Sequence, residues 1–423
     1  MTALQNIYWR KIGVIGLLRL FTGVAQFTVI ILVTSALTLQ DVGSYTLFTI
    51  YLNYTAQFAG FSFYTYFVRT ISTISPKELG PTLYQIWIAL FFTVGSTIFC
   101  MCILVWTGLL HISNIFLFFL LVILTVFNTQ HENFLVAVRA PVIAAFLLLL
   151  RSCWVYVALV IHYLGFFDLS LEFVYQLWIA SEAVAAIMIL IYLRAERMLP
   201  TTVHPIDIAW IKRGLCSSLK YTVLGFLLIL TVSSQRVFLS PYGGEQYVGI
   251  FHFFYVVSVF GPNLVEATIY AVLLPRIIRA TSEAGHVFLP PSFRIMGFML
   301  AINVVGLGLL YLILPYAFGF LGKVELATHF EVIRATICFA LLYTASRGFH
   351  YQLYAAGADN WILGTYTLSA LAGCGTSYLL IPKYGLTGAS VSLVFTGMTM
   401  LVALCLPFVM RLNLSLTGRT TSR

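Results

Sequence analysis

The chain has 423 residues, of which 61% are hydrophobic and only 9% carry a charge. Its mean hydropathy of +0.97 excludes an ordinary water-soluble protein, because a soluble fold of this length cannot bury so much apolar surface, and most of the chain must be dissolved in lipid. The formal net charge of +9 requires no nucleic-acid partner, since basic cytoplasmic loops and anionic lipid headgroups account for it.

Apolar stretches of roughly 20 residues, each long enough to cross the hydrocarbon core as a helix, recur about twelve times along the chain. The first stretch is too long for the apolar core of a cleaved signal peptide. The sequence therefore predicts an all-α, multi-pass integral membrane protein. The helices are expected near residues 12–37, 42–67, 84–109, 112–137, 141–164, 172–193, 215–240, 246–273, 292–316, 330–355, 361–381 and 385–410.

The short connections between these spans alternate in charge. Basic residues such as Arg69, Arg194 and Arg197 follow even-numbered spans, whereas residues 107–113 and 165–171 contain no Lys or Arg. Because cytoplasmic loops carry an excess of Lys and Arg, we expect both termini and the even-numbered connections to be cytoplasmic.

The longest polar connection, residues 194–214, lies between the sixth and seventh spans and contains two prolines. It predicts two six-helix lobes, residues 1–199 and 215–423, joined by a cytoplasmic linker of residues 200–214.

A short repeat supports this division. Val42-Gly43-Ser44-Tyr45 opens the second span and Val248-Gly249-Ile250-Phe251 opens the eighth, and each follows an acidic residue, Asp41 or Glu245. Six spans per lobe give both lobes the same orientation, so we expect them to be pseudosymmetric about an axis along the membrane normal.

Several spans carry polar side chains at steps of three or four residues, which places them on one helix face. A polar face avoids lipid, so these stripes predict a hydrated central cavity between the lobes, although polar residues that merely hold helices together are the alternative. The candidates for a cationic lining are Arg19, Arg151, Arg236 and Arg347, and those for neutral hydrogen bonding are Asn53, Gln57, His252 and Tyr255.

An arginine at the centre of a span costs roughly 3 kcal/mol or more on insertion scales, so it needs a partner or water. Glu182 lies at the depth of Arg151 across a hairpin, which would allow an ion pair, and Glu266 lies at the depth of Lys220. Arg347 has no acidic residue at matching depth in the following span.

The other charged residues inside the spans can also be explained without a cargo. Arg19 and Arg236 lie near enough to span ends for their long side chains to reach the headgroups. Glu132, near the cytoplasmic end of the fourth span, is expected to pair with Arg139. Because basic residues outnumber acidic ones inside the spans, we expect the lining to attract an anion.

Motifs for covalent chemistry are lacking. The sequence contains no Walker A loop, no HExxH motif and no nucleophile elbow, and its seven cysteines lie almost entirely in apolar runs. Gly261-Pro262 interrupts the eighth span, where proline predicts either a hinge or a static bend. We therefore expect a transporter rather than an enzyme, with no metal site and no cofactor beyond a coupling ion, H⁺ or Na⁺.

Four local motifs together resemble one family. They are residues 42–45 (VGSY), 245–251 (EQYVGIF), 347–357 (RGFHYQLYAAG) and 382–390 (PKYGLTGAS), in this order and spacing. The whole chain thereby resembles the polysaccharide-exporter branch of the multidrug/oligosaccharidyl-lipid/polysaccharide (MOP) superfamily, and within it the Wzx-type O-antigen flippases.

The resemblance implies twelve spans in two lobes around a cavity that opens alternately to either side of the bacterial inner membrane. The implied cargo is an undecaprenyl-diphosphate-linked oligosaccharide, moved from the cytoplasmic to the periplasmic leaflet, with the polymerase and chain-length regulator of lipopolysaccharide biosynthesis as further partners. Relatives often carry an acidic residue before the basic one late in the seventh span, where this chain has Gln235-Arg236. Glu182 and Glu266 are then the remaining candidates for ion coupling.

Two other functions remain open. A multidrug-extrusion (MATE-like) drug/cation antiporter is expected to carry an acidic cation site in its first lobe, whereas the first span here offers Arg19. A membrane-bound O-antigen polymerase usually has a large periplasmic loop with basic residues, whereas the outer connections here are short.

Overall fold

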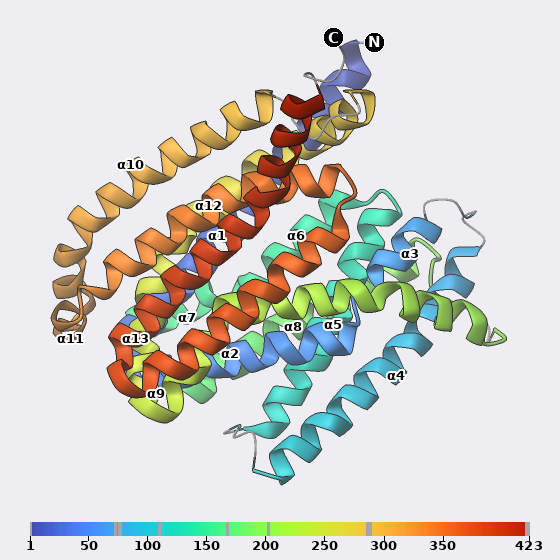
Figure 1. Cartoon of the computed structure of the whole chain (residues 1–423). Coiled ribbons are helices and arrows are strands. Elements are labelled where there is room, and N and C mark those ends of the chain that lie inside the picture. Colours follow the sequence, from blue (N-terminus) through green and yellow to red (C-terminus); the bar gives the residue numbers. More distant parts are fainter. Residues whose placement is uncertain are drawn as a thin grey trace. The chain divides into compact units, whose positions relative to one another are not determined.

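The computed structural model describes residues 2–71, 74, 78–108, 112, 114–165, 169–200, 204–284 and 290–418, with side chains except those of 2–12, 267–276, 278–295, 320 and 411–418. Every element within these residues is a helix (Figure 1), which confirms the expected all-α class. The chain forms two compact units, the first made of Met1–Leu32 with Phe48–Ile229 and the second of Val33–Leu47 with Leu230–Arg423.

The first unit is built mainly from the N-terminal half of the chain. In it, α5, α6 and α8 pack together, and α3 packs against α5. Its helices are α1 (Thr2–Ala36), α2 (Leu39–Gly60), α3 (Tyr64–Ile71), α4 (Leu79–Trp106), α5 (Ile115–Ala137), α6 (Pro141–Ser152), α7 (Trp154–Tyr163), α8 (Leu171–Ala195) and the beginning of α9 (Ile208–Ala284), with the junction of α1 and α2 assigned to the second unit.

The second unit contains the rest of α9 and the helices that follow it. Figure 1 shows α10 alongside α12, and α12 also packs extensively on α13. These helices are α10 (Pro290–Leu321), α11 (Val324–Thr328), α12 (Val332–Ala355) and α13 (Asp359–Gly418). The predicted lobes, 1–199 and 215–423, stay a prediction, since the two units are defined by packing and not by the linker.

The observed helices account for the twelve predicted spans. Eight helices of the described chain are long and apolar enough to cross a membrane, and two of them, α9 and α13, each contain two predicted spans. Gly244 (φ 72°) and Gly385 (φ 52°) separate those pairs, because glycine adopts the left-handed conformation of such a turn without strain. The more polar α2 and α12 supply the remaining two spans.

Two spans are broken where no break was predicted. The second span divides into α2 and α3 at Phe61 and Ser62, whose φ angles of 49° and 44° are uncommon for residues with a side chain. The fifth divides into α6 and α7 at Cys153. The eighth span, in contrast, continues as helix through Gly261-Pro262, so the hinge assigned to this pair stays a prediction.

The distribution of polarity suits a bilayer. Phe91, Phe92, Phe99 and Trp106 of α4 are exposed, Trp106 by 86%, whereas polar side chains such as Asn128 are buried. Such an arrangement is stable only where hydrocarbon surrounds the helices.

The two copies of the sequence repeat meet within the second unit. A Cβ atom at Gly43 would overlap the backbone carbonyl of Glu245, and one at Gly249 would overlap that of Leu39. Leu39 precedes Gly43 by four residues and Glu245 precedes Gly249 by four, so the two helices exchange equivalent contacts. The Ser44 hydroxyl also donates to Oε2 of Glu245 at 2.6 Å. The two copies of the sequence repeat therefore make matching contacts where their helices cross.

Candidate functional site

In the first unit, Arg151 lies between two glutamates. Its Nε donates to Oε2 of Glu182 at 2.8 Å and its Nη1 to Oε1 of Glu132 at 2.9 Å. Nδ2 of Asn128 donates to the same Oε2 of Glu182 at 2.6 Å and to the Glu182 carbonyl at 2.9 Å. The suggested ion pair between Arg151 and Glu182 is therefore present, with a second carboxylate added. We call Asn128, Glu132, Arg151 and Glu182 the carboxylate cluster.

The expectation that Glu132 pairs with Arg139 is wrong. Arg139 adopts a left-handed conformation (φ 65°) beyond the end of α5 and is exposed. This turn carries its side chain off the helix, whereas Arg151 at the end of α6 packs directly against α5 and α8.

In the second unit, Arg236 of α9 contacts two of the residues predicted with it. Its Nη1 lies 3.0 Å from Nδ1 of His252, and its guanidinium lies 4.4 Å from the ring centroid of Tyr255. Because a guanidinium only donates, Nδ1 of His252 accepts and carries no proton. Nη2 donates to the Val232 carbonyl at 2.6 Å, and the arginine is 6% exposed.

Arg347 of α12 is held by a denser set of partners. Its Nε donates to Oε1 of Glu266 at 2.7 Å, its Nη1 to the Tyr366 hydroxyl at 2.9 Å and its Nη2 to the Tyr351 hydroxyl at 3.2 Å. Tyr351 in turn donates to Glu266 at 2.6 Å. Glu266 thus pairs with an arginine 81 residues away, while Lys220, which the sequence put at its depth, belongs to the first unit.

Aromatic rings connect the two arginines of the second unit. Tyr255 packs on Phe339 at 5.9 Å between centroids, Phe339 on Tyr343 at 6.0 Å, and the Arg347 guanidinium lies 5.6 Å from the Tyr343 ring. We call Arg236, Tyr255, Phe339, Tyr343 and Arg347 the arginine–aromatic ladder.

The ladder and the partners around it include residues that the sequence analysis did not select, namely Phe339, Tyr351 and Tyr366. The first two share a signal that could have found them. Phe339, Tyr343, Arg347 and Tyr351 recur at steps of four, which is one face of α12. Tyr366 comes from another helix, α13, and no local pattern marks it.

Three predicted contact residues belong to neither group. Arg19 on α1 and Asn53 on α2 are exposed. Nε2 of Gln57 donates to Oγ of Ser62 at 3.0 Å and to the Thr222 carbonyl at 3.2 Å, which is a helix-packing contact. Their roles toward a cargo stay predictions.

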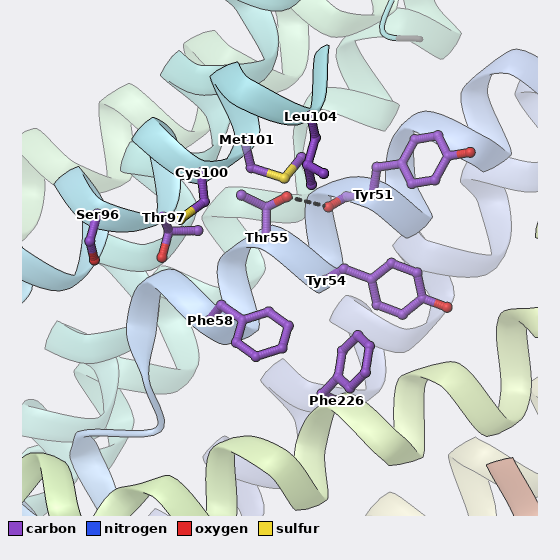
Figure 2. Close-up of a pocket in the computed structure, with 10 residues that line it drawn as sticks. All are labelled: Tyr51, Tyr54, Thr55, Phe58, Ser96, Thr97, Cys100, Met101, Leu104 and Phe226. Carbon is purple, nitrogen blue, oxygen red and sulfur yellow. Dashed lines mark hydrogen bonds between the residues drawn. The ribbon is translucent and has the colours of Figure 1, made fainter. Parts of the chain in front are cut away.

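A cavity of about 430 Å³ opens between α2, α4 and the first part of α9, within the first unit. Figure 2 shows Tyr54 and Phe58 beside Phe226, whose ring centroid lies 5.3 and 4.9 Å from theirs. The Thr55 hydroxyl donates a hydrogen bond to the Tyr51 carbonyl oxygen at 2.7 Å. The lining is therefore almost entirely apolar and suits a hydrocarbon chain. It consists of Tyr51, Tyr54, Thr55, Phe58, Ser96, Thr97, Cys100, Met101, Leu104 and Phe226.

The described side chains contain no group of three or more His, Cys, Asp or Glu residues that could hold a metal ion. Gln235, at the position where relatives of the resembled family often carry an acid, is buried and donates to Thr396 at 3.2 Å.

No protein-family model matches the chain. No curated protein is significantly similar to it either. Solved structures are similar over nearly the whole length. The inward-facing conformation of a multidrug resistance MATE family transporter of the MOP superfamily matches with a TM-score of 0.74 at 14% identity, over 95% of this chain and 96% of that one. The lipid II flippase MurJ in an inward closed conformation matches with a TM-score of 0.70 at 10% identity, over 92% of this chain and 87% of that one. An outward-facing MATE family transporter matches with a TM-score of 0.63 at 15% identity, over 95% of each chain. The chain therefore has the helical membrane-transporter fold that MATE transporters and MurJ share.

Proposed function

We propose that this protein is a MOP-superfamily flippase that moves undecaprenyl-diphosphate-linked O-antigen repeat units from the cytoplasmic to the periplasmic leaflet of the bacterial inner membrane. The observation that carries the proposal is the arginine–aromatic ladder: two buried arginines among rings and hydroxyl groups, inside membrane-spanning helices. The protein works by alternating access, with both termini in the cytoplasm and without covalent catalysis.

The ladder matches the polar part of such a cargo. A sugar unit with about ten hydroxyls would lose ~2–7 kcal/mol for each polar group left unpaired in hydrocarbon, so it needs a polar path. Guanidinium groups donate paired hydrogen bonds to phosphate oxygens, which suits a diphosphate. Aromatic faces offer apolar surface, and tyrosine adds a hydroxyl.

The apolar cavity of the first unit matches the other part of the cargo. Aromatic and sulfur-containing side chains such as Phe58, Met101 and Phe226 line it, and a polyprenyl chain is hydrocarbon throughout. The fold is consistent with this proposal, because one of its similar structures is named as a lipid flippase.

A MATE-like drug/cation antiporter is the second candidate. The carboxylate cluster favours it, since two glutamates surround one arginine there, and two of the three similar structures above are multidrug transporters. The ladder argues against it, because Arg236 and Arg347 outnumber Glu266 and would repel a cationic drug.

The test is complementation of a strain that lacks its O-antigen flippase. We expect R236A to abolish surface polysaccharide and R236K to restore part of it, because lysine keeps the charge but not the paired donors. R197A, at an exposed position, is the matched control and should complement fully. Normal polysaccharide from an R236A variant that reaches the membrane would refute the proposal. Drug resistance conferred by the wild type without any polysaccharide would favour the antiporter.

A further inference from the structure

A group of neutral polar side chains lies buried in the second unit, where α9 contacts α13. Nε2 of Gln235 on α9 donates to Oγ1 of Thr396 on α13 at 3.2 Å, and Thr396 donates in turn to the Ser392 carbonyl at 2.7 Å. The side chains of Ser234, Gln235, Ser392 and Thr396 belong to residues that are each 0% exposed. We call these four residues, together with Gly373, the hydroxyl cluster. None of its members carries a charge.

Two hydroxyl oxygens of the cluster face the same point beside Gly373. A Cβ atom built on this glycine would lie 2.9 Å from Oγ1 of Thr396 and 3.1 Å from Oγ of Ser234. One small molecule near that point can therefore reach both oxygens within hydrogen-bonding distance. Within the described part of the chain, Oγ of Ser234 has no hydrogen-bond partner. Because a buried hydroxyl normally has one, the position beside Gly373 points to a ligand.

The hydroxyl protons determine which ligand fits. Thr396 gives its one hydroxyl proton to the Ser392 carbonyl, so toward a ligand it can only accept. Ser234 has a proton to donate. The ligand must therefore donate to Thr396 and accept from Ser234, and water does both. Oε1 of Gln235, which has no partner among the described residues, is a further acceptor in the same cluster. We propose that the hydroxyl cluster binds one ordered water molecule, which bridges Ser234 and Thr396 beside Gly373.

Other ligands fit the same oxygens less well. A cation cannot accept the proton of Ser234, and an anion cannot donate to Thr396. The cluster also has no charge that would balance either ion. A sugar hydroxyl can both donate and accept, but Ser234 and Thr396 are completely buried, which leaves no path for a molecule of that size. A buried water usually makes about three hydrogen bonds to polar groups that would otherwise be unsatisfied, which is what this cluster offers.

The water connects α9 with α13 next to the arginine–aromatic ladder. Arg236 follows Ser234 by two residues, so it leaves α9 on the opposite side of the helix. A bridge that fixes the rotation of α9 at Ser234 therefore also fixes the direction in which Arg236 extends toward His252. This water site goes beyond the proposed function and does not depend on which cargo the protein carries.

A density map of the full-length protein in nanodiscs, at a resolution that shows ordered water, tests the proposal directly. We expect a spherical peak within hydrogen-bonding distance of both Oγ of Ser234 and Oγ1 of Thr396. This measurement uses the wild type, so it does not require any variant to fold. A map that shows ordered water elsewhere in the interior of the protein but none at this position would overturn the proposal.

Variant S234A distinguishes a bound water from a dry site. If the water is bound, S234A removes one of its hydrogen bonds and should lower the melting temperature by a few degrees, whereas in a dry site it removes an unsatisfied hydroxyl and should raise it. S217A is the matched control and should leave the melting temperature unchanged, because Ser217 of the same helix is exposed and its hydroxyl donates to the Gly214 carbonyl at 3.0 Å.

An S234A variant at least as stable as the wild type would overturn the proposal. A melting temperature that rises with Na⁺ but not with choline in the wild type, and with neither in S234A, would assign the site to a cation and overturn it as well. Neither the map nor the melting temperatures involve the cargo, so either failure leaves the flippase proposal standing.

Discussion

At the scale of single residues, the arginines owe their burial to specific partners. Arg347 is 9% exposed and binds Glu266, Tyr351 and Tyr366 at once. Removing one member of a buried ion pair leaves the other charge uncompensated, which typically costs about 3–5 kcal/mol, whereas replacing both members can be nearly neutral.

We therefore expect R347M to lower the stability of the purified protein by about 3 kcal/mol or more. The double variant R347M/E266Q should recover most of that loss, because no unpaired charge remains. Thermal unfolding in detergent measures both. A double variant no more stable than R347M would show that the ion pair does not account for the burial of Arg347.

The same double variant separates structure from function. If Arg347 also meets the cargo, R347M/E266Q should fold and reach the membrane yet fail to complement a flippase-deficient strain. Full complementation would limit Arg347 to a structural role and leave Arg236 as the arginine of the ladder that binds cargo.

At the scale of helices, the crossing of α2 and α9 depends on two glycines. Gly43 and Gly249 each allow a backbone carbonyl of the opposite helix to approach, and an added Cβ would overlap that carbonyl. The backbone cannot move aside as a flexible side chain can.

We expect G43A and G249A each to destabilise the protein by about 1–3 kcal/mol, as overpacking does. G306A is the matched control, because nothing lies within 4 Å of a Cβ built at Gly306 of α10. It should be neutral or stabilising by up to about 1 kcal/mol, since alanine favours helix. Equal stability of G43A, G249A and G306A would show that the close crossing is not present.

The apolar cavity is also formed by helix packing, and one matched pair of cysteines tests its role. Cys100 and Cys102 are both exposed on α4, but Cys100 lines the cavity and Cys102 does not. C100W should fill part of the space and reduce polysaccharide export several-fold, whereas C102W should export normally. Equal export from both variants at equal membrane levels would exclude the cavity as the site of the lipid chain.

The length and spacing of the helices could be predicted from the sequence because each apolar stretch must cross the same thickness of lipid. The predicted span 172–193 corresponds to α8 (Leu171–Ala195) and the span 141–164 to α6 and α7 together. The break at Cys153 could not be predicted, because no glycine or proline lies beside it. The break at Phe61 directly follows Gly60, the last residue of α2, so a local signal was present there.

The candidate site was predictable only in part. Arg236, His252 and Tyr255 were selected because polar side chains recur at helical spacing in their spans, and they do lie together. The partners of Arg347 and Glu132 could not be predicted. Their contacts join residues 81 and 19 positions apart, on helices whose rotation about their own axes the sequence does not specify. Helix depth alone could match Arg151 with Glu182 but could not show that Glu132 joins them.

At the scale of the whole molecule, the cargo distinguishes the two candidate functions. The fold is shared by multidrug transporters and by a lipid flippase, so the fold does not choose between the two cargoes. The chemistry of the side chains favours the lipid-linked sugar, since a guanidinium-rich ladder and an apolar cavity suit an anionic headgroup and a hydrocarbon tail.

The most direct measurement is a flipping assay with the purified protein in liposomes. A short oligosaccharide linked through diphosphate to a polyprenyl chain is placed in one leaflet, and a membrane-impermeant reagent that modifies the sugar reports its arrival in the other. We expect transfer with the wild type and with R197A, and none with R236A. Liposomes in which the wild type leaves the sugar in its original leaflet, while it exchanges a cationic drug for protons, would contradict the account.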